Sequence, residues 1–98
     1  MKHLSEKELM TQLKLASRLV EVGAIYAHYR NPKSRYQVID LSIIEATQEV
    51  GVIYRKEFGS KALSSIIWVR PLSSWCEKIC VEDAMVPRFQ KVVELQNF

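Results

Sequence analysis

The segment from Tyr26 to Tyr36 holds the residue types of this chain that are best suited to binding. Three tyrosines and three cations lie within it, and no acid does: Tyr26, Tyr29, Tyr36, Arg30, Lys33 and Arg35. Tyrosine rings stack on bases or prolines, and arginines hold phosphates or carboxylates. The alternative is that the tyrosines fill a small core while the cations line a solvated turn. The residues alone leave both readings open.

Three arginines further along the chain also lie next to or near an aromatic residue. They are Arg55 beside Tyr54, Arg70 close to Trp68, and Arg88 beside Phe89. Arginine stacks on aromatic faces and forks onto carboxylates. These arginines therefore form either a cationic groove on one face or a set of internal ion pairs. Trp68 and Arg70 share one side of their strand because they are two residues apart.

No group of residues describes a reaction or a metal site. His28 has the chemistry of a general base, but no motif supplies it with a partnered nucleophile. Cys76 and Cys80 are four residues apart, and His3 and His28 are distant from them in sequence, so a four-ligand zinc site is not expected. We expect two buried free thiols, and neither a metal nor a cofactor.

Size and composition describe one small globular domain. The chain has 98 residues, of which 48% are hydrophobic and 26% charged, which argues against disorder. Fourteen basic and eleven acidic residues give a net charge of +3, which permits an anionic partner without requiring one. Two cysteines make no disulfide framework, no signal peptide is visible, and no apolar run approaches the roughly 20 residues that span a bilayer. We expect a cytoplasmic protein without membrane contact.

The N-terminal part of the chain predicts one amphipathic helix. Ser5 and Glu8 fit a capping box, in which each side chain accepts a hydrogen bond from the backbone N–H of the other residue. Apolar residues then recur at three- and four-residue steps, as on a helix with one apolar side. The helix is predicted over residues 6–20 and should end near Gly23.

The rest of the chain predicts about five short strands. Their ranges are 24–30, 35–44, 50–56, 66–70 and 87–93. Within the second strand, Ile39, Leu41 and Ile43 alternate with polar residues, which predicts that these three share the buried face. Residues 57–65 and 81–85 are predicted as loops, and residues 72–79 as a helical turn or an edge strand. Trp75 is expected to cover one end of the core. Short strands at close spacing favour a small barrel or roll.

Five motifs occur in an order and spacing that is similar to a known family. They are Gly23-Ala24-Ile25-Tyr26-Ala27-His28-Tyr29, Tyr36-Gln37-Val38, Val52-Ile53-Tyr54-Arg55, Trp68-Val69-Arg70-Pro71-Leu72 and Val86-Pro87-Arg88-Phe89. From about Gly23 to Phe89 the chain resembles the bacterial family catalogued as domain of unknown function 1653. The resemblance implies a compact barrel or roll of the SH3-like type, and it implies no activity.

The chain departs from the family pattern in three places. Where the family commonly has histidine-serine-glutamate-threonine, this chain has Ile44-Glu45-Ala46-Thr47, so only the threonine matches. The loop before Trp68 is several residues longer than usual. The N-terminal helix lies outside the typical short member, so it is expected to cover the β domain or to contact a partner.

These observations predict a mainly β protein in which one amphipathic helix precedes a small SH3-like barrel or roll of about five antiparallel strands. We expect a helical extension over 1–22, the β domain over 23–93 and a tail over 94–98. The expected function is that of a non-catalytic adaptor that binds a protein or peptide, as a monomer or weak homodimer. The expected partner-binding residues are Tyr26, His28, Arg30, Arg35, Tyr36, Arg55, Trp68 and Arg70.

Two alternatives to the adaptor remain. One is nucleic-acid binding through the basic and aromatic segment 26–36. The other is a small enzyme, or a domain that regulates an enzyme, in which His28 would be essential for activity.

Overall fold

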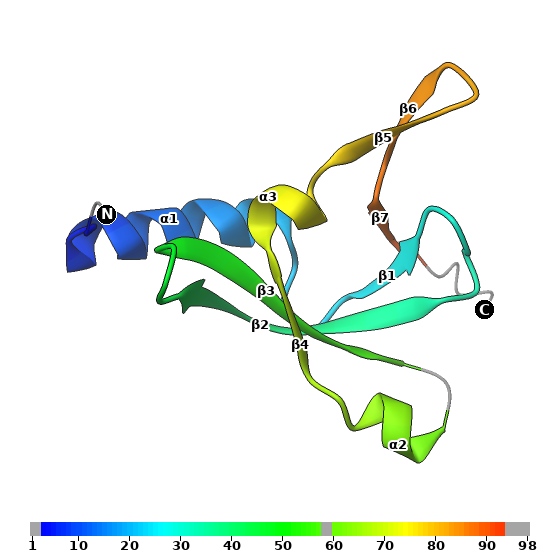
Figure 1. Cartoon of the computed structure of the whole chain (residues 1–98), viewed down its shortest axis with the longest axis horizontal. Coiled ribbons are helices and arrows are strands. Elements are labelled where there is room, and N and C mark those ends of the chain that lie inside the picture. Colours follow the sequence, from blue (N-terminus) through cyan, green and yellow to red (C-terminus); the bar gives the residue numbers. More distant parts are fainter. Residues whose placement is uncertain (1–2, 58–59, 94–98) are drawn as a thin grey trace, which may run out of the picture.

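The structure is a computed structural model that describes residues 3–57 and 60–93. Its helices are α1 (Glu6–Leu19), α2 (Lys61–Ser64) and α3 (Leu72–Trp75). Its strands are β1 (Ile25–His28), β2 (Arg35–Ile44), β3 (Glu49–Lys56), β4 (Trp68–Pro71), β5 (Lys78–Val81), β6 (Ala84–Pro87) and β7 (Phe89–Lys91) (Figure 1). The protein is therefore mainly β and begins with a helix, as predicted. The predicted tail at 94–98 lies outside the described residues.

Helix α1 forms where the sequence predicts it and ends one residue earlier. The Ser5 hydroxyl oxygen accepts the backbone N–H of Glu8 at 3.1 Å, and the Glu8 carboxylate accepts the N–H of Ser5 at 3.2 Å. This reciprocal pair satisfies two N–H groups that a helix start leaves without partners. After the helix, Gly23 takes a φ of 89°, which glycine adopts without strain, and its N–H donates to the Val38 carbonyl at 2.8 Å. No helix in the described part of the chain is long and apolar enough to cross a membrane.

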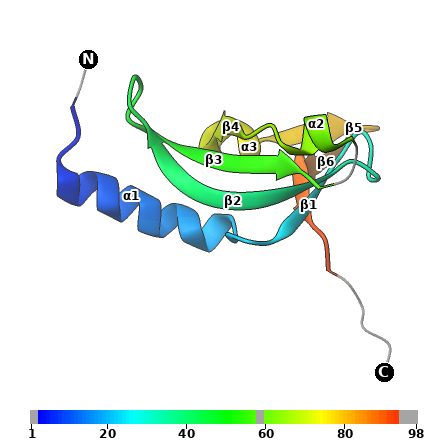
Figure 2. The same ribbon diagram turned by 90° about the horizontal axis from the view of Figure 1, so that it is seen from below.

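Five of the strands form one antiparallel sheet in the order β4-β3-β2-β1-β7. Figure 2 shows that β2 and β3 curve along their length, with α1 lying beside them. Side chains directly opposite one another on paired strands point to the same face. The face that carries the core, called the inner face here, includes Tyr26, His28, Tyr36, Val38, Val52, Tyr54, Trp68, Arg70 and Phe89.

A β-bulge in β2 changes the predicted set of buried residues. The pairing with β3 shifts between Val38 and Asp40, so the backbone has one extra residue at Ile39. Val38 is fully buried and Leu41 packs against the core, whereas Ile39 is exposed. The prediction that Ile39 shares the buried face with Leu41 and Ile43 is therefore wrong for Ile39, because the bulge turns its side chain outward.

The core lies between the inner face and the two helices that cover part of it. From α1, Ala16 and Val20 are buried. From α3, Trp75 is only 2% exposed, and its ring stacks on Phe89 with centroids 3.9 Å apart and an interplanar angle of 7°. The edge of Trp75 also meets Tyr26 at 5.4 Å. Trp75 thus covers one end of the core, as predicted.

The prediction of a small barrel or roll holds in part, since the five strands form one antiparallel sheet that does not close into a barrel. In residues 3–57 and 60–93, no ladder joins the two edge strands, β4 and β7. Pro71 ends β4 because proline has no N–H to donate, and the chain turns at once into α3. Trp75 then bridges the opening through side-chain stacking on Phe89 rather than through backbone hydrogen bonds.

Two segments predicted as loops contain regular structure. Residues 81–85 include the turn of a hairpin, in which β5 and β6 pair and project away from the sheet (Figure 1). Its two central residues, Glu82 and Asp83, both have positive φ, as a tight hairpin turn requires. The segment 57–65 contains α2, capped by the Ser60 hydroxyl oxygen, which accepts the N–H of Leu63.

Cys76 and Cys80 are free and solvent-exposed, so the prediction of buried thiols is wrong. Cys76 lies at the end of α3 and Cys80 lies in the projecting hairpin, where no core covers them. No group of three or more potential metal ligands forms in the described ranges.

The two tryptophans give a matched test of this arrangement. Trp75→Ala should lower the free energy of unfolding by about 3–5 kcal/mol, because it removes the buried ring that bridges the sheet edges. Trp68→Ala should cost less than about 1 kcal/mol, because Trp68 is 47% exposed. Urea denaturation followed by circular dichroism measures both, and Trp75→Phe keeps a ring in place should Trp75→Ala fail to fold. Equal costs for the two alanine variants would contradict this core.

Candidate functional site

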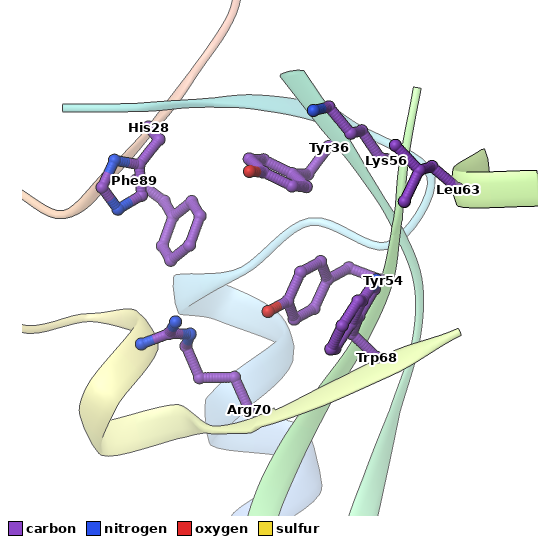
Figure 3. A pocket seen from close by; sticks show the side chains of 8 residues that line it. All are labelled: His28, Tyr36, Tyr54, Lys56, Leu63, Trp68, Arg70 and Phe89. Atoms are coloured by element: carbon purple, nitrogen blue, oxygen red, sulfur yellow. The ribbon is translucent and has the colours of Figure 1, made fainter. Parts of the chain in front are cut away.

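One end of the inner face is left uncovered and forms a pocket of about 400 Å³ (Figure 3). Its eight lining residues come from β1, β2, β3, β4, β7 and α2. They are His28, Tyr36, Tyr54, Lys56, Leu63, Trp68, Arg70 and Phe89. We call this the aromatic pocket, because four of the eight are Tyr, Trp or Phe.

The aromatic rings hold one another at fixed angles. Tyr36 meets Tyr54 edge to face at 5.6 Å, and it meets Phe89 in the same way at 5.8 Å. In Figure 3 the hydroxyl of Tyr54 points into the space between the labelled side chains, and Trp68 lies alongside Tyr54. Neither tyrosine hydroxyl has a hydrogen-bond partner in the described part of the chain. Tyr54 and Phe89 are buried, so the ring surface open to a ligand is mainly that of half-buried Tyr36 and of exposed Trp68.

Arg70 supplies the strongest polar group of the pocket. Its guanidinium lies over the Phe89 ring at 5.5 Å, and Nη1 donates to the Ser74 hydroxyl at 2.9 Å. The Nε–H of Arg70 is enclosed but has no acceptor within the described ranges. A buried donor without a partner is costly, whereas a charged donor that meets an anion makes a strong hydrogen bond. Arg70 is thus held in place on two sides and still has donor groups free.

The charged residues that line the pocket are all basic. Lys56 lies at the end of β3, directly opposite Tyr36, and its ammonium group has no ion-pair partner among the residues that the structure describes. None of the eight lining residues carries a carboxylate. The field inside the pocket therefore favours an anion, and the rings favour a flat or apolar group beside it.

The surroundings of His28 favour the neutral form of its ring. Its Nδ1 accepts the backbone N–H of Arg30 at 3.2 Å, which assigns the ring proton to Nε2. Partial burial lowers the pKa of His28 below its ordinary value of 6.5, and the positive charges of Arg88, Arg70 and Arg30 lower this pKa further. The ring also meets Phe89 edge to face at 5.2 Å, so it forms part of the pocket wall.

Four of the eight predicted site residues meet in this pocket: His28, Tyr36, Trp68 and Arg70. Tyr26 instead lies in the core, where its hydroxyl oxygen accepts the backbone N–H of Glu21 at 2.9 Å. The segment 26–36 therefore does not form one continuous binding face, since its tyrosines separate into core, turn and pocket.

The other three predicted residues lie away from the pocket. Arg55 points to the outer face of the sheet and donates to the Gln37 side-chain oxygen at 3.0 Å. Arg30 lies in the turn after β1, with its guanidinium 5.9 Å from the Tyr29 ring centre. Arg35 pairs in register with Ala27 and so faces outward as well.

Four pocket residues were not predicted: Tyr54, Lys56, Leu63 and Phe89. Strand alternation carries the signal for two of them, because Tyr54 and Lys56 are two residues apart and share a face. Leu63 comes from α2, in the segment predicted as a loop, and nothing in its sequence neighbourhood points to the sheet. Arg88, the third arginine near an aromatic, makes an internal ion pair with Glu77 at 2.8 Å.

The lowered pKa of His28 predicts a pH dependence of stability. Below about pH 6.5 the unfolded chain takes up a proton at His28 more readily than the folded chain does. The free energy of unfolding should therefore decrease as the pH is lowered through this window. His28→Gln should reduce the fall in thermal midpoint between about pH 7.5 and about pH 5.5. His3→Gln is the matched control, since His3 is exposed before α1, and it should leave the fall unchanged. An identical fall in all three proteins would contradict this account of His28.

Comparisons with known proteins agree with the fold. The family model described as "Protein of unknown function (DUF1653)" matches residues 24–91. A similar solved structure is the crystal structure of a protein belonging to DUF1653 from Bordetella bronchiseptica. It is 25% identical, with a TM-score of 0.60, over 78% of this chain and 92% of that one. No curated protein matches the chain. Helix α1 lies outside the matched residues, as the resemblance implied. The chain belongs to the DUF1653 family.

Proposed function

We propose that this protein is a non-catalytic binding module, and that its aromatic pocket takes an anionic group of a partner protein or peptide. The observation that carries the proposal is the guanidinium of Arg70, which lines a pocket without acids and whose side-chain hydrogen bond, from Nη1 to the Ser74 hydroxyl, uses only part of its donors. A carboxylate in the pocket would pair with this guanidinium and would meet Lys56 in the same space.

The aromatic rings of the pocket indicate which chemical group of the ligand should lie beside the anion. Tyr36, Tyr54 and Phe89 wall a space of about 400 Å³, and Trp68 stands half exposed beside it. A space of this size is at the lower end for small-molecule sites, which suits one side chain better than a large cofactor. An aromatic or apolar side chain next to a carboxylate therefore fits both the walls and the charge.

A binding role also agrees with the chemistry that the lining residues offer. The eight side chains include no serine, cysteine or carboxylate that could act as a nucleophile or as a partner for His28. His28 uses Nδ1 to accept a backbone N–H, which keeps the ring fixed in the wall. We therefore assign His28 the role of shaping the pocket wall and of offering its Nε2–H as a hydrogen-bond donor.

The proposal predicts a charge-selective ligand response. N-acetylphenylalanine, which joins an aromatic ring to a carboxylate, should shift the NMR signals of the pocket residues, and its neutral amide should not. Arg70→Gln should weaken N-acetylphenylalanine binding about tenfold or more, because it removes a charge-assisted hydrogen bond. Arg55→Gln is the matched control from the outer face of the same sheet, and it should change the affinity less than about twofold.

Two outcomes would contradict the proposal. One is equal binding of the acid and the amide, which would remove the role of charge. The other is a response to uridine monophosphate and to single-stranded oligonucleotides that exceeds the response to the aromatic acid, which would favour a nucleic-acid partner.

A further inference from the structure

The edge strand β4 and the residues before it expose a continuous apolar run. Ile66, Ile67, Trp68 and Val69 are 39%, 57%, 47% and 57% exposed. β4 is the last strand of the sheet and is hydrogen-bonded to β3 alone. Natural proteins usually protect such an edge with lysine, proline or a bulge, because an open edge is a template for pairing with another chain. Among residues 66–71 of this edge, such protection comes from Pro71 at the far end of β4 and from the inward-facing Arg70.

The backbone of this edge is available as well as its side chains. In an antiparallel pair, each strand directs only alternate N–H and C=O groups toward its neighbour. The Ile66 N–H turns back to the Leu63 carbonyl. From Ile67 to Arg70, no backbone hydrogen bond to an element other than β3 forms within residues 3–57 and 60–93. The outward half of the β4 backbone groups is thus open to an added strand.

The edge and the aromatic pocket are parts of one surface. Trp68 and Arg70 belong to β4 and also line the pocket, and Lys56 lines it from the neighbouring strand. A strand added beside β4 would carry alternate side chains next to Trp68 and Arg70. Because the nearby charges in the pocket are cationic and unopposed, an acidic side chain at that position is favoured over a neutral or basic one.

We propose that β4 accepts an extended, acidic peptide segment of a partner protein as an additional strand of the sheet, with one carboxylate of that segment on Arg70. Backbone hydrogen bonds to the edge would supply affinity, and the pocket would select the acidic side chain. The inference rests on the proposed function, because it uses the same pocket and specifies how the partner reaches it.

Hydrogen–deuterium exchange on the full chain tests the proposal with a defined probe. The probe is an acetylated, amidated peptide of alternating threonine and valine that carries one central glutamate. Saturating peptide should slow exchange of the β4 amides about tenfold or more, and exchange at the other sheet edge, β7, should not change. A peptide with glutamine in place of glutamate, and one with alternate N-methylated residues, should each bind about tenfold more weakly.

The outcomes separate this inference from the proposed function. If N-acetylphenylalanine still binds the pocket but no peptide protects β4, the edge proposal is overturned and the pocket proposal stands. If the N-methylated peptide binds as well as its parent, backbone pairing is overturned. Protection of β4 without peptide, together with a doubled mass in sedimentation, would identify a second copy of the chain as the occupant and overturn the peptide. Protection of β4 by an oligonucleotide and by none of the peptides would also overturn the peptide proposal.

Discussion

The stacking of the Trp75 ring on Phe89 determines which end of the inner face is covered and which end stays open. β4 and β7 are the two edges of the sheet, and the chain between them turns through α3 instead of pairing the edges directly. Trp75 fills the gap from α3, and Val20 of α1 completes the core beside it. Because one tryptophan covers only one end of the inner face, the other end remains the aromatic pocket.

The same geometry places positive charge beside the rings of the aromatic pocket. Arg70 spans from β4 toward Phe89 of β7, so its guanidinium packs against the far edge of the sheet and also lines the pocket. Arg88 differs, since Glu77 and the Ser74 carbonyl oxygen already engage its guanidinium. The two arginines thus differ: Arg88 fixes the connection between α3 and β7, whereas Arg70 lines the pocket.

The sequence predicted those features of the fold that depend on residues close together in the chain. The capping box of Ser5 and Glu8 located the start of α1. The spacing of Trp68 and Arg70 placed both on one side of β4, and the structure directs that side to the pocket. These predictions succeeded because they depend on neighbours within a few residues.

Features that depend on partners far along the chain were not predictable in the same way. The alternation around Ile39 looks regular, and only the pairing with β3 shows that a bulge turns this residue outward. Glu82 and Asp83 adopt a tight turn although they are not the asparagine and glycine that usually announce one. Tyr26 resembles a binding residue in sequence, yet its register opposite Tyr36 and its contact with Trp75 bury it.

An anion bound in the aromatic pocket should pair with the Arg70 guanidinium, and the Nε–H signal of this side chain in a ¹⁵N-correlated NMR spectrum reports that contact directly. N-acetylphenylalanine should move the Arg70 Nε–H signal downfield and slow its exchange with water, while the Arg88 and Arg55 signals stay in place. An Arg70 signal that does not respond while Arg88 or Arg55 does would contradict it.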